Sequence, residues 1–207
     1  MNVASLKTFR HGVHPPDSKE LTRGLAVRRL PFAPEYIVLL SQHTGAPARP
    51  LVRKGQEVVR GEPIAAPGGF VSVPMHAPVT GVVTKIDVAR TATGSMAPAV
   101  YIRAYPGSSQ EVLYGGAFDV DSASPPELVA AVQETGLVGL GGAAFPTHVK
   151  MAVPDGKSVD TVVANGCECE PFLTTDHRLM LERKEALFRG LAIALRATGA
   201  RRALIAV

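Results

Sequence analysis

A cluster of glycines followed by a lysine is the segment of this sequence best suited to hold an anion. Gly139, Gly141 and Gly142 precede a predicted short helix that starts near residue 146, and Lys150 lies about one turn beyond that start. Glycines let backbone N–H groups approach a phosphate or a flat ring without obstruction by Cβ, and the lysine can bring a cation back toward the anion. Taken alone, such a loop is equally compatible with a tight structural turn.

The glycine spacing superficially fits the dinucleotide-binding fingerprint. Gly139, Gly141 and Ala144 occupy its three small-residue positions. However, the fingerprint has to follow a strand, and here it follows a predicted helix that stops at Gly136. We therefore do not expect an ordinary Rossmann domain.

A second group of polar residues follows the β-branched, apolar run 159–164. Asn165, Glu168 and Glu170 come directly after it, where parallel α/β sheets usually bind ligands. Asparagine can hydrogen-bond a flavin or a ribose, and carboxylates can accept bonds from ribose hydroxyls or a nicotinamide amide. The alternative is that these residues only cap the next turn, and both interpretations stay open.

The two cysteines, Cys167 and Cys169, lie in this same segment. They supply two thiolates at most, whereas a structural zinc or an iron–sulfur cluster typically needs four ligands. The six histidines show no metal spacing beside them. We expect free thiols and no metal site in the chain, and we find no Ser/His/Asp constellation for catalysis.

The segments that must position these residues fall into two parts. Residues 1–30 lack sustained periodicity and are predicted as an extended N-terminal arm, whereas residues 31–105 contain short β-prone runs separated by turn signals. The predicted strands are 36–40, 50–53, 57–59, 63–65, 70–73, 82–86 and 100–102. Many short strands at close spacing indicate a small barrel or sandwich.

Within this part, residues 46–86 resemble the biotinyl/lipoyl hammerhead, an all-β fold also called the barrel-sandwich hybrid. The resemblance rests on two phrases, residues 52–64 and 76–83. A true carrier domain presents a lysine at a hairpin tip, because an amide to biotin or lipoate needs an exposed amine. Here the tip, residues 67–69, reads Pro-Gly-Gly. We therefore expect a structural docking domain.

Residues 106–124 are predicted as a linker, after which helices and strands alternate through residues 125–207. The expected helices follow Ser124, start near residue 146 and span 176–198, and the expected strands are 159–164 and 203–207. Such alternation implies a parallel α/β sheet. Because a buried parallel strand is a poor terminus, we expect a truncated domain. The fold class is thus α+β: a barrel-sandwich hybrid followed by a truncated α/β parallel-sheet domain.

Composition excludes several classes of function. The net charge of +4 comes from 22 basic and 18 acidic residues without a run of five like charges, and tryptophan is absent. These features argue against binding of nucleic acid. The longest apolar runs fall short of the roughly 20 residues of a membrane helix, so a membrane link would have to pass through a partner.

The two polar segments together resemble a known family. Residues 139–150 are similar to the glycine-rich signature of the NADH- and FMN-binding flavoprotein subunit of respiratory complex I. Residues 165–180, with 9–16 and 41–47, resemble the C subunit of the Rnf ion-translocating electron transport complex. The resemblance covers nearly the whole chain in order. Ala144 departs from it by replacing a usual glycine, and Cys167 replaces an FMN-contacting aspartate of the complex I relatives.

The resemblance implies an FMN/NADH-binding domain in residues 125–207. FMN would be contacted by Gly139, Gly141, Gly142, Lys150, Asn165 and Glu168, and NADH by Phe145 and Glu170. It also implies hydride transfer from NADH to FMN, and then single electrons to [4Fe-4S] clusters that the family holds in a part absent from this chain. In such chemistry the protein supplies orientation and a dry pocket.

The same resemblance implies membrane subunits of an Rnf-type complex and a ferredoxin-type electron carrier subunit as partners. It places the protein peripherally, on the cytoplasmic face of the bacterial inner membrane. Two alternatives stay open. One is a non-catalytic docking or scaffold module of the same complex, and the other is a cobalamin-reductase-type relative that shares the glycine loop.

Overall fold

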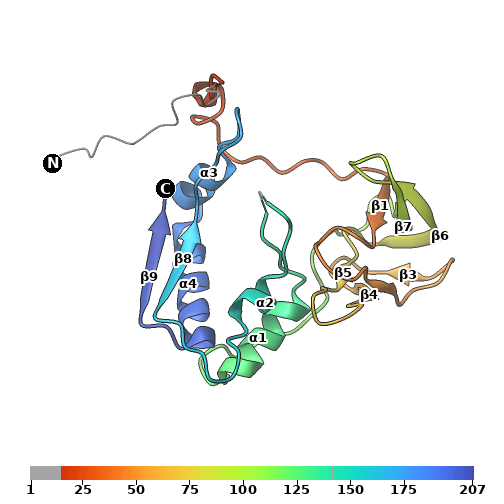
Figure 1. Cartoon of the computed structure of the whole chain (residues 1–207). Coiled ribbons are helices and arrows are strands. Elements are labelled where there is room, and N and C mark those ends of the chain that lie inside the picture. The colour runs from red at the N-terminus through yellow and green to blue at the C-terminus, as the bar shows by residue number, and fades with distance from the viewer. Residues whose placement is uncertain (1–14, 141) are drawn as a thin grey trace.

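A β-rich part and a part made of helices with a small parallel sheet lie next to each other in the computed structural model, which describes residues 15–140 and 142–207 (Figure 1). From residue 15 the chain lies over the helical part, crosses to the β-rich part, and then returns through α1 and α2. This arrangement confirms the predicted α+β architecture of two parts.

The β-rich part, called the barrel below, consists of two antiparallel sheets with strand orders β1-β7-β6-β3 and β2-β4-β5. The strands are β1 Glu35–Leu39, β2 Arg49–Pro50, β3 Glu57–Val58, β4 Pro63–Ala66, β5 Met75–His76, β6 Gly81–Arg90 and β7 Met96–Ala104. Inward side chains of both sheets share one apolar core. Its most buried members, each at most 1% exposed, include Leu40, Ile64, Val79, Val83 and Ile102.

The prediction of a strand at 70–73 is wrong, because these residues form a bend and β5 begins only at Met75. Hydrogen bonds to the Ser72 side chain hold this segment, where a strand would be held by backbone hydrogen bonds to its neighbours. The hydroxyl of Ser72, which is fully buried, donates to the Ala46 carbonyl (2.8 Å) and accepts the N–H of Gly68 (2.8 Å). The same bonds fold the tip 67–69 back onto the barrel.

Strands β6 and β7 are longer than the predicted runs 82–86 and 100–102. They form one hairpin in which Gly81 pairs with Ala104 and Arg90 with Met96. Cross-strand pairing therefore extends the strands through residues of weak β propensity. The hairpin ends in a turn closed by the Thr91 N–H and the Ser95 carbonyl (2.7 Å).

The helical part contains a two-stranded parallel sheet and four helices. Their bounds are α1 Pro125–Glu134, α2 Thr147–Met151, β8 Thr161–Asn165, α3 Thr175–Glu182, α4 Lys184–Thr198 and β9 Arg202–Ala206. As predicted, Glu127 caps α1 by accepting the Ser124 N–H (2.8 Å), and Gly199 ends α4 with φ 71°. A small core joins α1, α2 and α4 through Leu128, Met151 and Ala197.

The single helix predicted for 176–198 is two helices. Arg183 leaves helical geometry (φ −131°, ψ 32°) and separates α3 from α4. The residue types do not indicate this break, because residues 182–184 are Glu-Arg-Lys, all good helix formers. The two helices have different surroundings, since α3 is contacted by the arm described next, whereas α4 also packs against α1 and β8.

The described portion of the arm docks on α3 and the segment before it. The Phe172 N–H donates to the Asp17 carbonyl (2.8 Å), and the Thr22 hydroxyl donates to the Phe172 carbonyl (2.7 Å). Further along, the Val27 N–H donates to Glu182 (3.2 Å). The arm therefore contributes to the helical part, although the barrel follows it in the sequence. Residues 1–14, which include most of the segment 9–16, lie outside the described residues.

Hydrogen bonds between described residues connect the barrel with the helices. The side chain of Gln133 on α1 donates to the Ser72 carbonyl (3.3 Å), and His148 Nε2 on α2 lies 3.0 Å from the Phe70 carbonyl oxygen. A carbonyl only accepts, so Nε2 carries the proton. His148 is 2% exposed, which makes this contact part of the packed interior.

The packing of the barrel core predicts that two isoleucines of the barrel contribute very differently to its stability. Ile64 is fully buried, whereas Ile37 on β1 is 56% exposed. We expect Ile64→Ala to lower the free energy of unfolding by about 2–5 kcal/mol and Ile37→Ala by less than about 1 kcal/mol, measured by urea denaturation. Equal losses would contradict the barrel packing.

Candidate functional site

The glycine loop, residues 139–145, is a hairpin-like excursion closed at its base. Val138 bridges Pro146 in antiparallel fashion, the Gly139 N–H donates to the Phe145 carbonyl (3.0 Å), and the Thr147 N–H donates to the Leu137 carbonyl (3.0 Å). In Figure 1 the loop between α1 and α2 points the same way as β8 and β9 run. Gly141 lies outside the described residues, so its predicted role stays a prediction.

The ammonium group of Lys150 lies against the backbone of this loop. A Cβ built on Gly139 would come within 2.6 Å of Lys150 Nζ, so any larger residue would displace the lysine. Gly142 has open space around it, with no atom within 4 Å of such a Cβ. The structure thus places a cation beside the backbone of the glycine loop.

Ala144 adopts the left-handed conformation, with φ 49°. Few residues other than glycine take up this conformation readily, because Cβ approaches the following carbonyl oxygen at a cost of roughly 1–2 kcal/mol. This explains in physical terms why a glycine would suit the position. The loop therefore carries local backbone strain beside its glycines.

At the carboxyl end of β8, Asn165 and Glu168 make hydrogen bonds to nearby backbone. Asn165 Oδ1 accepts the Cys167 N–H (3.0 Å), and the Glu168 carboxylate accepts the N–H groups of Asp176 (2.9 Å) and His177 (3.2 Å). Asp176 and His177 are the second and third residues of α3, and N–H groups in the first turn of a helix lack partners within the helix. Both side chains thus have the capping role that the sequence left open.

The charge of Glu168 follows from this geometry. Burial raises the pKa of its carboxyl, but the N–H groups at the start of α3 and the charge of Lys19 outweigh that effect, so the pKa lies below its ordinary value. The Lys19 ammonium also donates to the Glu168 carbonyl. The pKa of Asp176 is raised by burial and by the charges of Glu168 and Glu170.

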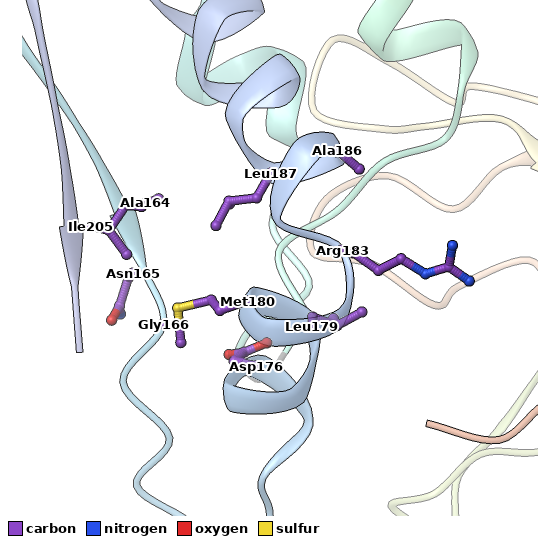
Figure 2. Close-up of a pocket in the computed structure, with 10 residues that line it drawn as sticks. All are labelled: Ala164, Asn165, Gly166, Asp176, Leu179, Met180, Arg183, Ala186, Leu187 and Ile205. Atoms are coloured by element: carbon purple, nitrogen blue, oxygen red, sulfur yellow. The ribbon is translucent and has the colours of Figure 1, made fainter. Parts of the chain in front are cut away.

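A pocket of about 290 Å³ opens between the end of β8 and the two helices that cross over it (Figure 2). Met180 reaches from α3 toward Gly166, whereas the Arg183 side chain extends away from the strands. Gly166 permits this approach, since a Cβ there would lie 3.0 Å from the Met180 methyl carbon. The lining is Ala164, Asn165, Gly166, Asp176, Leu179, Met180, Arg183, Ala186, Leu187 and Ile205.

The structure brings together only some of the predicted site residues. Asn165 lines the pocket and Glu168 lies beside it as the cap of α3, whereas Gly139 and Lys150 contact each other on the glycine loop and do not line this pocket. Phe145, half-buried, and Glu170, exposed, do not line this pocket. Three lining residues on α3, at positions 176, 179 and 180, were not predicted from the sequence, because their place depends on how the start of α3 is capped by Glu168.

The state of the cysteines, the grouping of possible metal ligands and the character of the helices concern metal binding and membrane insertion. Cys167 and Cys169 are exposed free thiols. Across the described ranges, no three His, Cys, Asp or Glu side chains come close enough together to hold a metal ion. Within those same ranges, no helix combines the length and the apolar character needed to cross a bilayer.

Comparison with known families matches both parts of the chain. Residues 7–105 match the family described as the RnfC barrel sandwich hybrid domain, and residues 132–207 match the Nuo51 FMN-binding domain. The fold and these matches define a chain in which a barrel-sandwich hybrid domain precedes a domain of the Nuo51 FMN-binding type. More particularly, the chain belongs to the RnfC family, the C subunits of Rnf-type ion-translocating oxidoreductase complexes. The resemblance seen in the sequence is thereby confirmed.

Three relatives illustrate the range of similarity. The C subunit of a Na⁺-translocating ferredoxin:NAD⁺ oxidoreductase complex of Acetobacterium woodii is 41% identical over 97% of this chain and 45% of its own length. Its counterpart in a proton-translocating complex of Clostridium ljungdahlii is 36% identical over 98% and 44%. The C subunit of the ion-translocating oxidoreductase complex of Pseudomonas aeruginosa is 39% identical over 92% and 25%. The chain thus spans less than half the length of these relatives.

The strain at Ala144 predicts that a glycine stabilises the loop. We expect Ala144→Gly to raise the free energy of unfolding by about 0.5–1 kcal/mol, because relief of roughly 1–2 kcal/mol of left-handed strain outweighs the entropic cost of a glycine, roughly 0.5–1 kcal/mol. Thermal unfolding measures it. The control is Ala143→Gly, because Ala143 does not take a positive φ, and there we expect a loss of stability.

The cap at Glu168 predicts a pH dependence. Because its folded pKa is lowered, Glu168 stabilises the fold above its unfolded pKa of about 4.3, and this contribution is lost as pH falls through the folded pKa. We expect Glu168→Gln to lower the free energy of unfolding at neutral pH by about 0.5–2 kcal/mol. The variant should also lose less stability than the wild type upon acidification.

Urea denaturation from about pH 7 down to about pH 3 tests this expectation. Glu170→Gln is the matched control, because the exposed Glu170 accepts none of the α3 N–H bonds described above. An acid profile of Glu168→Gln that follows the wild type would show that the cap does not carry the dependence.

Proposed function

We propose that this chain binds FMN through the glycine loop, as part of an NADH-linked electron-transfer subunit. The observation that carries the proposal is the Lys150 ammonium, which lies on the backbone of Gly139 in a loop with open space at Gly142. A cation beside a glycine-rich backbone suits a phosphate. The match of residues 132–207 to an FMN-binding domain supports the same ligand.

The end of β8 supplies the second half of the proposed site. Asn165 Oδ1 is engaged by the Cys167 N–H, which leaves the amide hydrogens of Asn165 to donate to a flavin. Glu168 fixes the start of α3, and α3 carries the Met180 side chain that lies against Gly166. The role of Glu168 toward FMN would thus be to hold α3 in place beside the end of β8.

Phe145 and Glu170 are proposed as contacts of NADH. Phe145 is half-buried at the base of the glycine loop, and Glu170 presents an exposed carboxylate. The ring offers an apolar surface for stacking, and the carboxylate can accept hydrogen bonds from ribose or amide groups. FMN, when bound, would supply acceptance of a hydride from NADH and release of single electrons.

The proposed place of the chain in a larger system comes from its relatives. Their names describe the C subunits of Na⁺- or proton-translocating ferredoxin:NAD⁺ oxidoreductase complexes. We infer that electrons pass to [4Fe-4S] clusters outside this chain, and that membrane subunits and a ferredoxin-type carrier subunit are its partners. A peripheral position on the cytoplasmic face of the inner membrane is part of this proposal.

A docking role without flavin is the second candidate, and exposed apolar side chains of the barrel favour it. Ile37 on β1, Val88 on β6 and Met96 on β7 are 56%, 48% and 57% exposed. Such side chains suit a protein contact. The two candidates differ in whether the chain binds FMN, which a titration decides.

Quenching of FMN fluorescence on addition of the purified chain tests the proposal. We expect saturable binding, and we expect Lys150→Met to weaken it about tenfold or more, because a hydrogen bond to a charged group contributes roughly 1.5–3 kcal/mol. The control is Lys157→Met, since Lys157 is an exposed lysine of the same part, in the turn after α2. Absence of saturable quenching by the wild type would rule out the flavin site.

A further inference from the structure

The barrel loop, residues 41–47, contacts the glycine loop directly. The Thr44 N–H donates to the Ala144 carbonyl (3.2 Å), and the Thr44 hydroxyl donates to the Ala143 carbonyl. These residues are about 100 positions apart in the sequence. One threonine of the barrel thus donates hydrogen bonds to two successive carbonyls of the glycine loop.

The barrel loop is held in place by contacts with its own backbone and with residues 71–72 of the barrel. His43 Nε2, on a side chain only 8% exposed, lies 3.1 Å from both the Ala46 carbonyl and the fully buried Ser72 hydroxyl. Gly45 has φ 116°, and a Cβ there would lie 1.9 Å from the Val71 carbonyl oxygen. The loop therefore has little freedom to move, and its exposed residue Thr44 is presented at a fixed place.

The bonds from Thr44 act on the part of the glycine loop that needs support. Its base is closed by the bond between Gly139 and Phe145, but Ala144 is in a strained left-handed conformation. A strained residue keeps its conformation only when its surroundings enforce it. The two bonds that end on Ala143 and Ala144 provide that enforcement from the barrel.

We propose that Thr44 is a positioning residue for the flavin site, through which the barrel keeps the glycine loop in the conformation that binds the ligand. This inference rests on the proposed function, because it takes FMN as the ligand of the loop. It also gives the barrel a role within the site itself, in addition to docking. Thr44 does not need to touch FMN for this role.

The test compares three variants in FMN titration. Thr44→Val keeps the shape and the backbone bond but loses the hydroxyl, and we expect it to weaken FMN binding about three- to tenfold, as for loss of a neutral hydrogen bond. Thr44→Ser keeps the hydroxyl and should restore affinity to within about twofold. Thr93→Val is the control, because Thr93 lines the same surface pocket as Thr44 but bonds Thr91 and Ser95.

A second readout separates positioning from general stability. We expect amide hydrogen exchange in residues 142–147 of the ligand-free chain to become faster in Thr44→Val, while exchange in the barrel core stays unchanged. A wild-type chain that does not bind FMN would overturn the proposed function and this inference with it. Wild-type binding with unaltered affinity or unaltered loop exchange in Thr44→Val would overturn the inference alone.

Discussion

The closed base of the glycine loop is the constraint on which the proposed site depends. The bonds between Gly139 and Phe145 and between Leu137 and Thr147 oblige the intervening residues to turn back on themselves. Because Gly139 has no side chain, Lys150 can return to the loop and place its ammonium against the backbone. A loop that was open at its base would leave neither the cation nor the backbone in a defined place.

Most of the fold could be predicted from local signals, and the errors have physical causes. The barrel followed from closely spaced turn signals, and α1 followed from the cap at Ser124. The strand predicted at 70–73 failed because a buried hydroxyl, Ser72, replaced ladder bonds. The break at Arg183 could not be predicted from the residue types, because residues 182–184 are all good helix formers.

The candidate site was predictable where it is local in the sequence. The closeness of Lys150 to Gly139 and the position of Asn165 at a strand end followed from spacing and hydrophobic pattern. The contact of Thr44 with Ala143 was not foreseeable, because it joins segments about 100 residues apart. For Glu168 the sequence allows both a capping and a ligand-binding role, since a carboxylate can accept hydrogen bonds from a helix or from a ligand equally well.

The docking of the arm on α3 bears on the order in which the molecule can be assembled during synthesis. Lys19 and Thr22 leave the ribosome early, but their partners Glu168 and Phe172 follow 149 and 150 residues later. The whole barrel is made in between and can form its core first. The arm then closes a very long chain segment, which costs entropy and favours late docking. The α3 edge of the pocket can therefore be completed only after residues 168–172 have been synthesised.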